Sequence, residues 1–183
     1  MKFIKKHMCM AALITCVFCI MCAPVTAYAG IFGNSKNTAA AASAATADDG
    51  FLFSSNGIEI KMGAEASAIT GALGAPLKPV FEMDSCAYQG KDKVYTYPGY
   101  ELSTCPSADG KSQVISNIYF LDSTIATPEG IKIGSTKQAA VTAYGKDYTE
   151  EFGVLHYKKG NSELIIYTTG TAVDGIEYLY QTK

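Results

Sequence analysis

The chain contains an internal repeat, and this feature constrains its fold more than any other. Ile60–Gly74 aligns with Ile131–Gly145 at an offset of 71 residues, with identity at the Ile, Lys, first Gly, two Ala and final Gly positions. A second stretch, Ile115–Leu121, aligns with Val173–Leu179 at an offset of 58. The first copy therefore holds 13 more residues between these landmarks, and we expect them within Gly90–Lys111. Self-similarity at a fixed spacing indicates two copies of one structural unit.

Each copy predicts a short strand, then a helix of about ten residues. The strands are expected at Gly57–Met62 and Gly130–Ile133. Ser135-x-x-Gln138 matches a capping box, and a Gly ends each helix, at Gly74 and Gly145.

Alternating apolar and polar residues follow each helix and predict antiparallel strands. They fall at Cys86–Gln89, Val94–Tyr97, Tyr100–Thr104 and Val114–Leu121, then at Gly153–Tyr157, Glu163–Thr168 and Ala172–Tyr180. One helix packed on an antiparallel sheet, given twice, is an α+β fold of two tandem modules. We expect the first module at 51–126 and the second at 127–183.

The segment Gly63–Pro76 resembles the helix motif of the SmpA/BamE lipoproteins and of the β-lactamase inhibitory protein (BLIP) superfamily. The tandem copy is similar to the BLIP-like arrangement of two modules side by side. Ser85–Tyr97 and Thr127–Gly134 resemble uncharacterised secreted or lipid-anchored proteins of clostridial Firmicutes. These motifs are structural, so the resemblance implies a fold and carries no catalytic or inhibitory residue to this chain.

The first 29 residues have the pattern of a secretory signal peptide. Lys2, Lys5 and Lys6 give a positive start, an uncharged apolar run follows, and Ala27-Tyr28-Ala29 is a small-x-small cleavage site. Cleavage after Ala29 is favoured over a retained membrane helix, because the apolar run is short and no basic cluster follows it. Residues 30–50 are an Ala-rich stretch that we interpret as a flexible linker. The sequence thus predicts a secreted or cell-surface protein without membrane insertion after cleavage.

Four of the six cysteines lie in this leader, and large residues before Cys19 and Cys22 argue against lipidation. Cys86 and Cys105 remain, and an even pair in an exported protein predicts a disulfide. Two separate thiols are the alternative. Fold geometry decides between them, because the two Cα atoms must approach within about 7 Å.

After cleavage the chain keeps twelve lysines, no arginine and seventeen acidic residues, which gives a net charge of −5. A net negative charge disfavours a nucleic-acid or anionic-membrane partner. No metal-binding spacing and no cofactor motif is present, so we expect neither.

His156 is the single histidine left after cleavage, so any catalytic triad would have to use it. A strand histidine that faces solvent or pairs with a neighbour is the more common case. No nucleophile or metalloprotease motif accompanies it. The sequence therefore predicts a non-enzymatic protein.

Tyrosine is abundant, and the chain has no Trp. Tyr95, Tyr97 and Tyr100 cluster around a turn, and tyrosine rings give a large amphipathic contact area. The other interpretation is that they are half-buried sheet residues. We predict that these three tyrosines form a binding surface.

These observations predict a secreted protein that binds a protein or cell-envelope component through its sheet surface. An inhibitor of a secreted enzyme is a second hypothesis, which the BLIP-like resemblance allows. An extracellular hydrolase built around His156 is a third. The sequence gives no oligomeric state.

Overall fold

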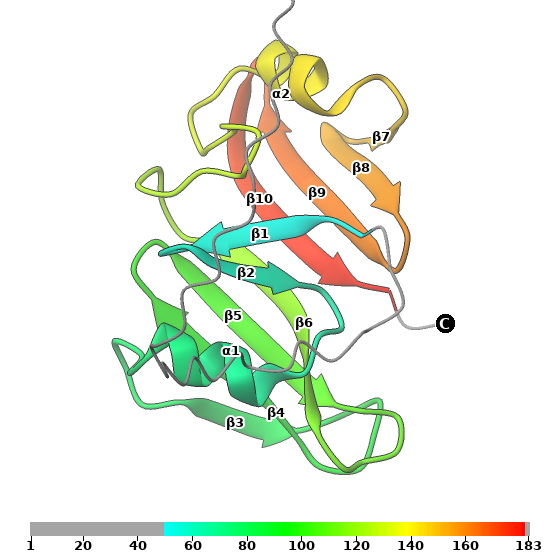
Figure 1. Ribbon diagram of the computed structural model, residues 1–183. Helices are drawn as coiled ribbons and strands as arrows, with labels where there is room; N and C mark the ends of the chain where they lie inside the picture. Colours follow the sequence, from blue (N-terminus) through cyan, green and yellow to red (C-terminus); the bar gives the residue numbers. More distant parts are fainter. Residues whose placement is uncertain (1–49, 182–183) are drawn as a thin grey trace, which may run out of the picture. The chain divides into compact units, whose positions relative to one another are not determined.

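The structure, a computed structural model, describes residues 50–181. The predicted signal peptide, its cleavage site after Ala29 and residues 30–49 of the linker lie outside them. The elements are, in order, β1 Leu52–Ser55, β2 Ile58–Lys61, α1 Ala66–Leu73, β3 Phe81–Asp84, β4 Lys91–Tyr97, β5 Tyr100–Pro106, β6 Gln113–Phe120, α2 Lys137–Tyr144, β7 Thr149–Glu151, β8 Val154–Lys159, β9 Ser162–Thr169 and β10 Ala172–Tyr180 (Figure 1).

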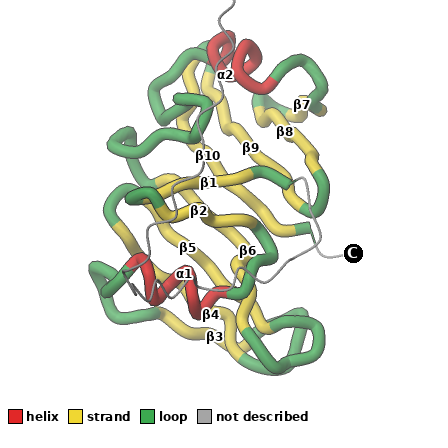
Figure 2. The backbone as a smooth tube through the Cα atoms, in the orientation of Figure 1, coloured by secondary structure: helices red, strands yellow, loops and turns green. Residues whose placement is uncertain are grey.

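Eight of these strands form one antiparallel sheet in the order β3-β4-β5-β6-β10-β9-β8-β7 (Figure 2). The predicted α+β class is confirmed. A helix followed by four strands occurs twice, from α1 to β6 and from α2 to β10. β6 pairs with β10, so both runs of four strands belong to the same sheet.

The hydrophobic core lies on one face of this sheet. Its central row crosses six strands through directly opposed residues: Tyr95, Leu102, Ile118, Tyr178, Leu164 and Tyr157. Ala66 of α1, Ala140 of α2 and Phe53 of β1 pack into the same cluster of buried side chains. Both helices and the β1–β2 hairpin therefore cover this face.

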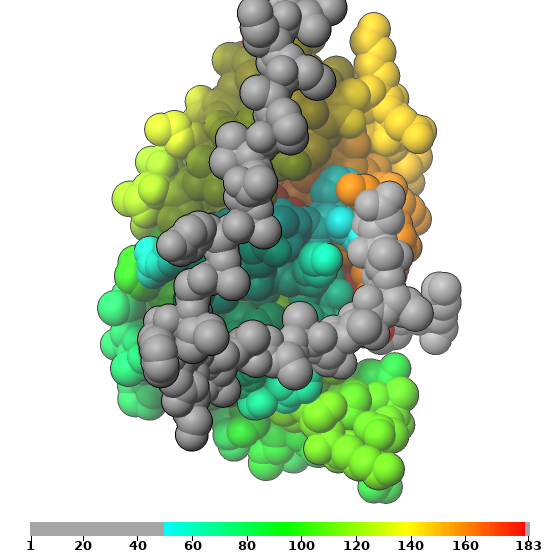
Figure 3. All heavy atoms as spheres, viewed as in Figure 1, coloured from blue at the N-terminus to red at the C-terminus, as the bar shows by residue number. Residues whose placement is uncertain are grey.

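The hairpin lies between the two halves of the sheet on this side. In Figure 3 its cyan atoms lie between the green residues of the first half and the orange residues of the second. Phe53 contacts the rings of Tyr100, Phe120 and Tyr178, with ring centroids 5.1, 5.4 and 5.8 Å away. The hairpin thus seals the core across β5, β6 and β10.

The helix termini differ from the prediction at one position. Thr136, not Ser135, caps α2, and its Oγ1 accepts a hydrogen bond from the Ala139 amide at 3.0 Å. Ser135 Oγ instead accepts from the Lys132 amide at 3.1 Å. The predicted C-terminal glycines are correct: Gly74 and Gly145 have φ of 80° and 87°, a conformation that glycine adopts without strain.

Two predicted strands are absent. Residues 130–133 are not a strand, because Gly130 and Thr127 donate backbone hydrogen bonds within the 127–131 turn, both at 2.8 Å. Residues 86–89 form the loop between β3 and β4. Both helices have eight residues rather than about ten. Strands β1, β3 and β7 were not predicted.

Phe53→Ala should lower the free energy of unfolding by about 3–5 kcal/mol, because it opens a cavity where the hairpin seals the core. Phe53 is 1 % exposed, whereas Phe152 in the β7–β8 turn is fully exposed. Phe152→Ala is the matched control and should change the stability by no more than about 0.5 kcal/mol. Urea denaturation measures both values, and similar losses in the two variants would contradict this role for the hairpin.

Candidate functional site

The three tyrosines predicted as a binding surface lie on the core side of the sheet. Tyr97 and Tyr100 are only 4 % and 1 % exposed, and Tyr95 packs against the core. Parts of Tyr97 and Tyr100 border a pocket of about 400 Å³ beside the α1 C-terminus. The prediction of an exposed tyrosine surface is therefore wrong for Tyr97 and Tyr100.

These tyrosines also do not belong to the 13 extra residues that we expected within Gly90–Lys111. They lie in β4 and β5, the second and third strands after α1, and β8 and β9 hold the same places after α2. Tyr95 and Tyr97 share one face of β4, as the two-residue period of a strand requires, and that face is the one covered by the core.

The predicted disulfide is not present. Cys86 is an exposed free thiol in the β3–β4 loop, and Cys105 is a half-buried free thiol in β5. Burial raises the pKa of the Cys105 thiol, and the charge of Asp92 adds to this effect.

The opposite face of the sheet carries a second row of directly opposed side chains. It crosses seven strands from β4 to β7: Thr96, Glu101, Tyr119, Glu177, Ile165, His156 and Thr149. Directly opposed residues of an antiparallel pair share a face. Ile165 is buried but does not join the core cluster, as expected for the other side of the sheet.

We call this side the helix-free face, because α1, α2 and the hairpin all contribute to the core on the other side. It points away from the viewer in Figure 1. A neighbouring row on the same face contains Phe81, Val94, Ser103, Asn117, Leu179, Glu163 and Lys158. Phe81 and Tyr119 are the exposed large hydrophobic side chains in these two rows, and Tyr119 is 40 % exposed at the centre.

Glu177 is the centre of a hydrogen-bond network on this face. Its carboxylate accepts from the amide of Asn117 on β6 and, at 2.7 Å, from the hydroxyl of Tyr167 on β9. Burial raises the pKa of Tyr167, and the acceptor Glu177 raises it further. The network holds Glu177 in place beside the ring of Tyr119.

His156 belongs to a second network on the same face. Its Nδ1 lies 2.8 Å from Glu163 Oε1, and Gln181 donates to the other oxygen of Glu163 at 2.7 Å. Within residues 50–181 no hydroxyl or thiol hydrogen-bonds to His156. The arrangement orients a histidine without completing a triad.

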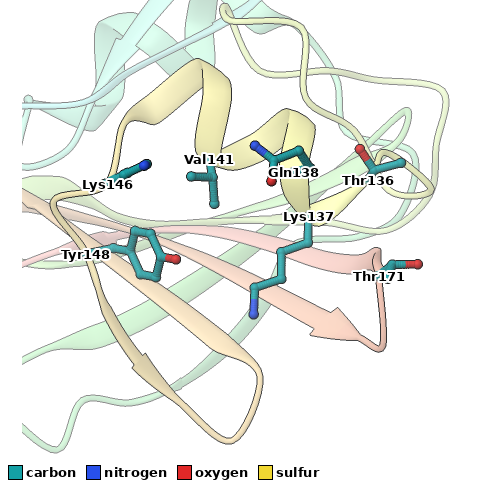
Figure 4. Close-up of a pocket in the computed structure, with 7 residues that line it drawn as sticks. All are labelled: Thr136, Lys137, Gln138, Val141, Lys146, Tyr148 and Thr171. Atoms are coloured by element: carbon teal, nitrogen blue, oxygen red, sulfur yellow. The ribbon is translucent and has the colours of Figure 1, made fainter.

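A pocket of about 470 Å³ lies between α2 and the segment that leads into β7 (Figure 4). Its lining consists of Thr136, Lys137, Gln138, Val141, Lys146, Tyr148 and Thr171. Lys137 is already ion-paired with Glu150 at 2.6 Å. The pocket therefore does not offer two uncompensated ammonium groups to an anion.

Among the described residues, no group of three or more His, Cys, Asp or Glu side chains could hold a metal ion. No helix in the same part of the chain has the length and apolar character needed to cross a membrane. Comparison with protein-family models, with curated proteins and with solved structures found no match.

Tyr119, Tyr167 and Glu177 were not predicted from the sequence. A usable signal was the aligned pair Ile115–Leu121 and Val173–Leu179, in which Tyr119 and Glu177 occupy equivalent positions. At this aligned position one copy carries an aromatic ring and the other a carboxylate, whereas the positions on either side of it are apolar or aromatic in both copies.

The buried tyrosines should make the protein sensitive to alkali. Burial raises the pKa of Tyr157 to about 12, and Tyr148 adds to this rise. The folded protein therefore holds the proton more tightly than the unfolded chain, so this contribution is complete below pH 10 and disappears as the pH rises through about 12. Tyr157→Phe should flatten the fall in unfolding free energy over this range, as measured by urea denaturation. An unchanged slope would contradict the assignment.

Proposed function

We propose that the protein is a non-enzymatic binding protein and that it contacts a partner protein through the helix-free face. The observation that carries this proposal is the row through Glu101, Tyr119 and Glu177, which places an exposed ring at the middle of a sheet face that no described helix covers. Tyrosine is favoured at protein interfaces because its rigid ring combines apolar area with a polar hydroxyl.

The dimensions of the sheet support a protein partner. Eight strands spaced about 4.8 Å apart span about 34 Å, and a seven-residue strand is about 23 Å long. The product is about 800 Å², which equals the area that one partner contributes to a stable interface of standard size. A small ligand would use only a fraction of such a face.

We also propose that the two halves are copies of one module in a BLIP-like arrangement. Repeat-equivalent backbone bonds support it: Gly63 donates to Ile115, and Gly134 donates to Val173, both at 2.8 Å. The isolated bridges Glu65↔Val114 and Thr136↔Ala172 are equivalent too.

The two central strands support the same proposal. The extra residues that shift the register there are Ser116 in β6 and Asp174 in β10, which differ by the repeat offset of 58. Tyr119 and Glu177 also differ by 58, and they lie directly opposite each other. Two copies of one module related by a local two-fold axis through this residue pair would bring the two equivalent positions opposite each other.

Export of the protein remains a proposal that rests on the leader in residues 1–29. The resemblance to the BLIP superfamily favours an enzyme among the possible partner proteins. The negative charge disfavours an anionic envelope polymer. A hydrolase built around His156 is the weaker hypothesis, since Glu163 is the hydrogen-bond partner of that ring and no hydroxyl or thiol within residues 50–181 hydrogen-bonds to it.

A photo-crosslinking amino acid tests the proposed face in producer cells. Placed at Tyr119, it should give a protein adduct; placed at Ala72, an exposed position on α1, it should give none. With the adduct identified, Tyr119→Ala should weaken binding of that purified protein about 30-fold, as expected for a central aromatic anchor. Leu77→Ala, an exposed site beside α1, is the control. An adduct at Ala72 alone, or equal affinities for both variants, would refute the proposal.

A further inference from the structure

We infer that the partner presents a cationic surface and that one of its lysine or arginine side chains docks on the ring of Tyr119, between Glu101 and Glu177. This inference rests on the proposed function and names the chemistry of its partner. It follows from the difference in charge between the two faces of the sheet.

Strand carboxylates on the core side are neutralised by lysines of the same chain. Asp84 pairs with Lys91 at 2.8 Å and Glu82 with Lys93 at 2.9 Å, and Glu150 pairs with Lys137 of α2 at 2.6 Å. The ion pairs raise the pKa of Lys91 and Lys93 and lower that of Asp84. The core side thus provides its own counter-charges.

The helix-free face differs. Glu163 lies beside His156 and opposite Lys158, but within residues 50–181 neither Glu101 nor Glu177 forms an ion pair. Alternation along the strands places five carboxylates and one lysine on it: Asp92, Glu101, Glu151, Glu163, Glu177 and Lys158. Glu177 accepts hydrogen bonds from the Asn117 amide and the Tyr167 hydroxyl. Glu101 accepts a hydrogen bond from the Thr96 hydroxyl at 3.3 Å. These neutral donors hold the two carboxylates in position, and within the described part of the chain they leave the charge of both without a lysine or histidine partner.

Tyr119 lies between two of these carboxylates. Glu101 and Glu177 flank it on β5 and β10, and opposed Cβ atoms in such pairs are about 4.5–5.5 Å apart. A cation over an aromatic ring is attracted when it lies within about 6 Å of the ring centroid. A lysine or arginine side chain above the exposed ring would therefore reach the ring and both carboxylates together.

The distribution of charge indicates a protein rather than a single ion. The acidic residues extend from β4 to β7, and among the described residues no three of them are close enough to hold a metal ion. Two copies of this chain would bring two acidic faces together, which is unfavourable. A folded partner with several lysines or arginines on one surface fits the whole face.

The test uses the full chain and a fluorescein-labelled octalysine peptide as the probe, followed by fluorescence anisotropy. Glu101→Gln/Glu177→Gln removes two charges from the helix-free face, and Glu82→Gln/Glu150→Gln removes two from the core side. Net charge changes equally in both. We expect the first pair to weaken binding about tenfold and the second to leave it within about twofold, because the contact is local.

The ring is tested in the same assay. Tyr119→Leu should weaken the binding of octalysine several-fold, whereas Tyr119→Phe, which keeps the aromatic face, should not. Thermal melting checks that each variant is folded. If the double variant is unstable, Glu101→Gln alone replaces it, since Glu101 accepts a single side-chain hydrogen bond in the described part of the chain.

Two results would overturn the inference: equal weakening by both double variants, or no binding of octalysine at low salt. Different results would contradict the proposed function, and the crosslinking experiment distinguishes the two cases. If the crosslinked partner binds Glu101→Gln/Glu177→Gln as tightly as the unaltered chain, the face binds a protein but not by this chemistry. If Tyr119 gives no adduct, the proposed face itself is wrong.

Discussion

The pairing of β6 with β10 is the interaction on which the rest of the structure depends. It joins the two runs of four strands through Asn117–Tyr119 and Glu177–Leu179. Without it, each half would have an additional unpaired edge and a smaller core. The same contact places Ile118 and Tyr178 in the central core row and Tyr119 and Glu177 in the row on the helix-free face. Fold and candidate site therefore share one strand pair.

Alternation within single strands and the glycines after the helices explain how much of the fold the sequence could predict. Strands with strong alternation, such as β10, were predicted with their observed bounds, and the glycines that end α1 and α2 were correct. The strands that were missed at the sheet edges, β3 and β7, are short and exposed at every position, so burial leaves no alternation in them. Residues 130–133 differ from β2 because β2 has β1 as a partner.

The site was less predictable from the sequence. The two-residue period of a strand assigns side chains to two faces, but it does not show which face the rest of the chain covers. In β4 one face carries Tyr95 and Tyr97 and the other carries Val94 and Thr96, and both sets suit a sheet. The β1–β2 hairpin determines which face is buried, because Phe53 packs on Tyr100 and covers the face that carries Tyr95 and Tyr97. A contact between residues so distant in sequence could not be read from the alternation within β4.

Register shifts in the two central strands link the core to the candidate site. Ile115 and Ile118 are three residues apart, yet both are buried in the core, because the extra residue near Ser116 reverses the alternation between them. Val173 and Ile176 share the same relation around Asp174. A regular β6 that kept Ile118 and Phe120 buried would turn Ile115 outward, to the side of Tyr119. The bulges therefore keep Ile115 and Val173 in the core and away from the helix-free face, where Tyr119 and Glu177 lie.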